Sequence, residues 1–176
     1  MACDFITAGK DLPCKDSVGG LKNVYFAQYG IDIDKSADDS VASSEFTGST
    51  FYQYELKGNS SLTQNIQTSR ENGTTAFEQV LELTLPKLSQ ADNQAIKLLA
   101  FGRPHIVVED YNGNFFIVGR EHGADVTGGT IVTGAAMGDL SGYTLTFTAM
   151  ERTPANIIPG TVGTDSFLDT ATIPAN

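Results

Sequence analysis

One segment, Leu62 to Leu85, constrains the fold of this chain more than any other. Residues expected on one face of a strand alternate along it with residues expected on the other face, with the period of two that is typical of a β-strand. The pair Asn72-Gly73 interrupts the alternation, and both residues accept the positive φ angles of a type I′ turn. The segment therefore predicts a long β-hairpin with roughly ten residues in each arm.

The first arm of this hairpin is polar on nearly both faces. A two-stranded hairpin is marginally stable in water, so another part of the protein, or another copy of it, should cover or extend this one. One interpretation is a hairpin that lies over the domain's own core. The other is a subunit interface, in which hairpins of neighbouring copies pair edge to edge and remove their exposed edges. The candidate interface residues are Leu62, Gln64, Ile66, Thr68, Arg70, Asn72 and Gly73.

A single helix is predicted directly after the hairpin, over about residues 89–101. Pro86 ends the second arm because it donates no ladder hydrogen bond. Ser89 is suited to the N-cap, and the apolar residues that follow recur with helical spacing. Gly102 and Pro104 stop the helix.

Shorter apolar runs bounded by turn residues predict the remaining strands. They lie at residues 21–29, 44–57, 105–110, 114–119, 126–133 and 142–150. We expect a mainly β fold, an antiparallel β-sandwich or small barrel with one α-helix. Residues 1–20 are expected to form an N-terminal arm, 21–153 the β-sandwich domain, and 154–176 a C-terminal arm or tail.

The charge balance excludes several classes of partner. The chain has 11 Lys and Arg against 21 Asp and Glu, a net charge of −10. This argues against a module that grips nucleic acid and against docking on anionic membranes. No apolar run is long enough to span a membrane, and we expect no signal peptide. Cys3 and Cys14 are expected to be free thiols in a reducing compartment.

The sequence offers no recognisable catalytic constellation. His105 and His122 have no Cys or second His nearby in the chain, and no nucleophile elbow or zinc-protease motif occurs. Glu109 and Asp110 are adjacent, so on a strand they point to opposite faces and are expected to be solvated beside a turn. We therefore expect no catalytic residues, no cofactor and no enzymatic activity.

One acidic loop has the spacing of a cation site. Asp32, Asp34, Ser36 and Asp38 place oxygen ligands at positions 1, 3, 5 and 7 of a calcium loop. Position 6 is Ala37 and position 12 is Ser43, where such a loop needs Gly and Glu. The two interpretations are a weak cation site and a solvated acidic loop, and we expect the second.

The order of strands, long hairpin, helix and further strands over residues 21–150 resembles that of bacteriophage tail tube proteins and related virion structural proteins. The segment Gly142-Tyr143-Thr144-Leu145-Thr146-Phe147-Thr148 adds to the resemblance. It implies a structural virion protein without catalysis, whose copies form rings that stack into a conduit for DNA. The implied partners are copies of itself and other phage tail or head proteins. DNA would pass without specific binding and no membrane would be involved, in a virion assembled in the host cytoplasm.

Two other readings remain open. A capsid decoration, connector or baseplate protein would share the same β scaffold. A carbohydrate- or ligand-binding β-sandwich would instead use exposed aromatic residues, for which Tyr52, Tyr54 and Tyr111 are the candidates, together with the acidic loop. Packing within the sheets is the alternative role of these tyrosines.

Overall fold

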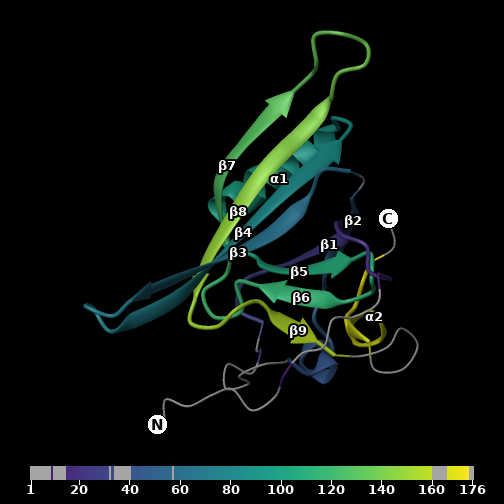
Figure 1. Cartoon of the computed structure of the whole chain (residues 1–176). Coiled ribbons are helices and arrows are strands. Elements are labelled where there is room, and N and C mark those ends of the chain that lie inside the picture. The colour runs from purple at the N-terminus through teal and green to yellow at the C-terminus, as the bar shows by residue number, and fades with distance from the viewer. Residues whose placement is uncertain are drawn as a thin grey trace.

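Two antiparallel sheets make up most of the fold, so the prediction of a mainly β sandwich is confirmed (Figure 1). The computed structural model describes residues 9, 15–31, 33, 41–56, 58–159 and 166–174. The five-stranded sheet has the order β2 (Tyr52–Glu55), β1 (Leu21–Ala27), β5 (His105–Asp110), β6 (Phe115–Val118) and β9 (Asn156–Ile158). The four-stranded sheet has the order β3 (Ser61–Ser69), β4 (Thr74–Pro86), β8 (Gly142–Glu151) and β7 (Asp125–Val132).

The central strand β5 of the five-stranded sheet is buried on both faces. On one face, Ile106 and Val108 of β5 join the main core against Leu83 and Phe147 of the four-stranded sheet. On the other face, Val107 packs in a second cluster, in which aromatic and aliphatic side chains mix. This double burial explains why β5 reads as a continuous apolar run in the sequence.

The helix α1 (Gln90–Phe101) forms where the sequence predicts it. Its first turn is capped by Ser89, whose Oγ accepts a hydrogen bond from the Asp92 amide at 3.0 Å. The hydroxyl of Tyr143 donates to the Ser89 carbonyl at 3.2 Å, which ties the helix start to β8. Gly102 ends the helix with a φ of −99°, so this position does not use the left-handed freedom of glycine.

The hairpin turn differs from the predicted type I′ turn. Ser69 pairs with Thr74, which leaves a loop of residues 70–73. Gly73 has a φ of 62°, whereas Asn72 is not among the residues of positive φ. A single left-handed residue at the end of a longer loop is typical of hairpins built on a type I turn, which the same Asn-Gly pair also permits.

The region predicted as one strand over residues 44–57 is divided in two. A 3-10 helix, η1 (Ser43–Phe46), precedes the short strand β2. Phe46 and Phe51 are fully buried and their rings meet edge to face at 5.7 Å. Part of the apolar run that predicted a strand therefore packs the η1 turn onto the second cluster.

The described parts of the C-terminal segment pack into the fold, against the expectation of a terminal arm. β9 pairs with β6 in the five-stranded sheet. The short helix α2 (Phe167–Thr170) begins with a capping box between Ser166 and Asp169. The Phe167 ring is fully buried among four aromatic rings, with centroids 4.9–5.5 Å away. A single buried aromatic residue such as Phe167 produces no periodic pattern in a sequence, so the sequence did not predict that this segment docks.

Candidate assembly surface

The candidate interface residues lie together on β3 and its turn. The register pairs Leu62 with Leu81 and Ile66 with Phe77, so the predicted face alternation is observed. Leu62 is half-buried against the main core. Gln64 accepts a hydrogen bond from the Ala155 amide at 2.7 Å. The first part of β3 is therefore anchored to the sandwich.

The far part of the hairpin extends beyond the sandwich (Figure 1). β8 pairs with β4 only from Phe77 onward, so no third strand of the described residues pairs with the arms beyond it. Ile66 sits at this boundary and is 68% exposed. Thr68 faces Thr75 with their hydroxyl oxygens 3.2 Å apart. The extension presents apolar and hydroxyl groups to solvent, with Arg70, Asn72 and Gly73 at its tip.

Both edges of the four-stranded sheet are open. β3 ends the sheet on one side and β7 on the other, and no strand of the described residues pairs with their outer edges. Edge strands that avoid pairing carry lysines, prolines or strong bulges. β3 has no lysine, proline or register shift along its nine residues. β7 has one register shift, between Val126 and Gly128.

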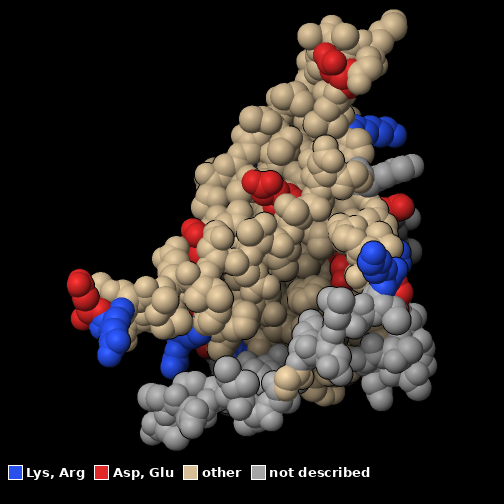
Figure 2. Space-filling view, in the orientation of Figure 1, with Lys and Arg blue, Asp and Glu red and all other residues tan. Residues whose placement is uncertain are grey.

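The face of this sheet that points away from the core is mainly polar, with Val80 and Met150 among its members, and its strands carry no basic residue. It presents Thr144, Thr146 and Thr148 of β8, with Glu82 and Thr84 of β4 opposite them. None of the strands β3, β4, β7 and β8 contains a Lys or Arg. In Figure 2 acidic side chains are scattered over the visible surface, and basic side chains lie toward its margins and at the hairpin tip. We call the face of the four-stranded sheet that points away from the core the outer face.

The loop that joins β7 to β8 projects at the opposite end from the hairpin (Figure 1). Met137 is fully exposed in it. The loop is held by Asp139, whose Oδ2 accepts the Ala135 and Ala136 amides at 2.9 and 2.7 Å. These hydrogen bonds lower the pKa of Asp139 below its usual value. The sequence predicts a strand over residues 126–133, but it does not show that this strand lies at the edge of a sheet.

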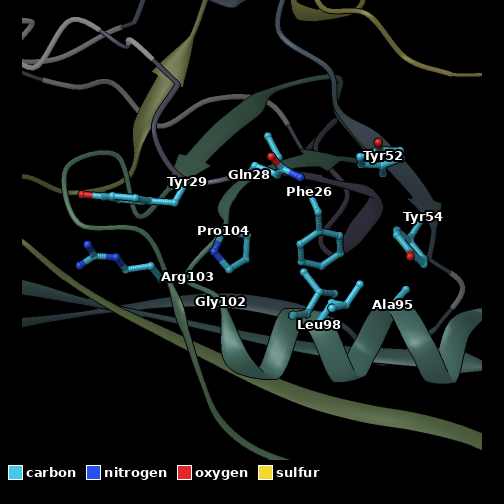
Figure 3. Close-up of a pocket in the computed structure, with 12 residues that line it drawn as sticks. Phe26, Gln28, Tyr29, Tyr52, Tyr54, Ala95, Leu98, Gly102, Arg103 and Pro104 are labelled. Atoms are coloured by element: carbon cyan, nitrogen blue, oxygen red, sulfur yellow. The ribbon is translucent and has the colours of Figure 1, made fainter.

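An apolar groove of about 500 Å³ lies between α1 and the β1–β2 side of the five-stranded sheet. Figure 3 shows Leu98 of α1 facing Phe26, with Tyr54 beside them. Tyr52 is 54% exposed at its rim. Two of the three tyrosines proposed for ligand binding are therefore together. Tyr111 lies apart, against Gly20 at the β5–β6 turn.

Polar side chains frame one end of this groove. The Arg103 guanidinium carbon lies 4.1 Å from the centroid of the Tyr29 ring, a cation–π contact. Tyr29 also stacks on His105, with ring centroids 5.1 Å apart. His105 is itself buried, and its Nδ1 lies 2.7 Å from the Gly119 carbonyl oxygen. His105 is therefore held as a structural residue.

Glu109 is buried, so its expected exposure beside the turn is wrong. Its carboxylate accepts hydrogen bonds from Lys22 Nζ at 2.7 Å, Asn23 Nδ2 at 2.6 Å and the Tyr25 hydroxyl at 3.0 Å. Burial first, and then the Glu109 charge, raises the pKa of Tyr25. Adjacent Asp110 does face the turn. The two carboxylates point apart, as the strand geometry requires, and form no acid–base pair.

The acidic loop proposed as a weak cation site cannot be placed here. Asp32, Asp34, Ser36 and Asp38 lie outside the described residues. Ile33 alone is described between them, and it is buried in the second cluster.

Comparison with known proteins returned no match among family models, curated proteins or solved structures. Within the described part of the chain, no helix is long and apolar enough to cross a membrane.

Proposed function

We propose that this chain is a structural virion protein, a tail tube subunit whose copies join through their four-stranded sheets into a ring. Stacked rings would form a conduit through which DNA passes. The observation that carries the proposal is the pair of open edges on one sheet whose outer face is mainly polar and free of basic residues.

The strand directions favour pairing of β3 in one copy with β7 in the next. Each neighbouring pair in the order β3-β4-β8-β7 is antiparallel, so β3 and β7 run in opposite directions. Side by side in a ring, the two edges would meet antiparallel and continue the alternation. A contact between identical hairpins would use one edge of each copy and stop at a dimer, whereas a head-to-tail contact closes a ring.

The width of such a barrel depends on the number of copies. With about 4.8 Å between strands and a tilt of about 40°, three copies would give a barrel about 24 Å across its backbone. Side chains would leave that barrel too narrow for a DNA duplex. Six copies would give about 48 Å, which leaves an open channel by the same geometry.

The outer face would line the channel. The five-stranded sheet and α1 cover the other face of the four-stranded sheet. In the closed barrel, threonines and the carboxylates of Glu78 and Glu82 would face the lumen. Without Lys or Arg there are no groups to hold phosphates, and like charges repel, so DNA would slide without sticking.

Electron microscopy of the purified chain over a concentration series tests this function. We expect rings of uniform diameter with an open centre, and stacks of them with a regular axial repeat. Discrete rings that never stack would favour the connector or decoration role. Particles of monomer size at every concentration, together with unpaired β3 and β7 edges, would contradict the assembly.

The apolar groove favours a second candidate, a ligand-binding module. Its aromatic lining and volume are typical of small-molecule pockets. A hydrophobic or glycan ligand seated against Tyr52 and Tyr54 should raise the melting temperature of the chain. Leu98→Lys should remove that rise. A ligand screen in which no compound raises the melting temperature would contradict the ligand-binding function and leave the structural role as the one remaining candidate.

A further inference from the structure

Three side chains with metal-binding atoms converge at one end of the sandwich. They are Glu121, His122 and Glu151, and one ligand atom from each lies within 4.8 Å of the others. Glu121 and His122 belong to the turn after β6, in the five-stranded sheet, whereas Glu151 ends β8 in the four-stranded sheet. The cluster thus joins the two sheets. It includes an imidazole as well as two carboxylates, a mixed set that suits transition metals better than Ca²⁺ or Mg²⁺.

Glu151 is held in place by backbone groups. Its side chain is only 2% exposed, and its Oε1 accepts the amides of Glu121 and His122, both at 3.1 Å. These contacts use one oxygen and aim the other, Oε2, at the His122 ring. A carboxylate fixed in this way by neighbouring donors is pre-oriented as a ligand.

The spacing of Oε2 and the imidazole is long for a hydrogen bond and also matches two ligands of one metal ion. His122 Nδ1 lies 3.4 Å from Glu151 Oε2. A well-formed N–H···O bond is about 2.7–3.2 Å long. Two ligands about 2.0–2.2 Å from a tetrahedral Zn²⁺ ion are separated by about 3.4 Å.

We propose that Glu121, His122 and Glu151 bind one Zn²⁺ ion. Nδ1 of His122 and one carboxylate oxygen from each Glu supply three ligands, and water supplies the fourth, because the His122 side chain is 62% exposed. The ion would clamp the β6–β7 turn to the end of β8. Glu151 pairs with Phe77, so the clamp lies where the hairpin leaves the sandwich. The proposal does not depend on the tail tube function.

Zinc titration of the full chain tests this site. Cys3 and Cys14 can also bind zinc, so the measurement uses a Cys3→Ser, Cys14→Ser background freed of metal with a chelator. Calorimetry should show one Zn²⁺ bound per chain, and zinc should raise the melting temperature. Cobalt in place of zinc should give visible absorption bands that lack thiolate charge transfer.

The variants separate a built site from adventitious binding. His122→Ala should weaken zinc binding at least tenfold and remove the thermal shift, while the metal-free melting temperature stays close to that of the parent. Glu151→Gln keeps an acceptor for the two amides and should also weaken binding. Glu82→Gln, which removes a carboxylate far from the cluster in sequence and on the outer face, should bind as the parent does. No zinc binding, or undiminished binding by His122→Ala, would overturn the proposal.

Discussion

Asp110 organises the turn between β5 and β6 through its carboxylate. Oδ1 accepts the amides of Asn112 and Asn114, both at 2.8 Å, and Oδ2 accepts their side-chain amides. Burial acts to raise the pKa of Asp110, but these hydrogen bonds outweigh it and hold the pKa below the usual 3.8. The charged form is therefore favoured by the folded chain.

The first prediction follows from that lowered pKa. A carboxyl group with a lower pKa in the folded than in the unfolded chain stabilises the fold above its unfolded pKa. The stabilisation is lost as the pH falls through the folded pKa. Asp110→Ala should lower the free energy of unfolding by about 1 kcal/mol at neutral pH, after allowance for solvent screening. Urea denaturation at several pH values should show this difference shrinking below pH 3.8. A difference that is constant down to acid pH would contradict the assignment.

The short helix α2 is expected to be part of the folded core. Phe167→Ala would leave a cavity among Tyr25, Phe46, Phe51 and Phe115 and should destabilise the chain by about 3–5 kcal/mol. Phe101→Ala is the matched control, because the Phe101 side chain is 83% exposed. Thermal denaturation followed by circular dichroism measures both. Equal melting temperatures for the two variants would show that α2 is not docked.

The hairpin extension provides a second prediction for an element. Replacing Ile66 and Thr68 together with lysine puts charge on an edge that otherwise carries none. Because Ile66 is largely exposed, the monomer should keep its melting temperature, while ring formation should be lost. Leu98→Lys with Phe101→Lys adds the same charge on α1 and should leave rings intact. Electron microscopy measures ring formation by both double variants. If both form rings equally well, β3 is not the contact between copies.

Local patterns were sufficient to predict the hairpin arms and α1. Alternation over Leu62–Leu85 and the cap at Ser89 depend on residues close in sequence. Remote partners decided what was missed: Glu109 is buried because Lys22, Asn23 and Tyr25 meet it from β1, more than 80 residues away. For the candidate site, the sequence could predict β3 as a contact edge, but it could not predict β7. The order of strands in a sheet cannot be deduced from the sequence of a single strand.

The proposed channel through the assembled rings should depend on the absence of basic groups from its wall. Glu82→Lys would place an ammonium group on the outer face without touching either edge. Assembled rings of this variant should retain DNA, whereas wild-type rings should not. The retention should weaken as the salt concentration rises. Glu55→Lys, an equal charge change on β2, should behave as wild type. A filter-binding assay on assembled material compares the three, and equal DNA retention by the two variants would place the outer face away from the channel.

In the proposed ring, copies join through the edges β3 and β7. Hydrogen–deuterium exchange with mass spectrometry, on dilute and on concentrated protein, tests it most directly. Amides that point outward from an edge strand exchange freely in a monomer and become protected once a neighbouring strand pairs with them. We predict that peptides covering β3 and β7 gain protection on concentration, while those covering β4 and β8 stay unchanged. Assemblies in which β3 and β7 exchange as fast as in the monomer would show that these two edges are not the contacts between copies.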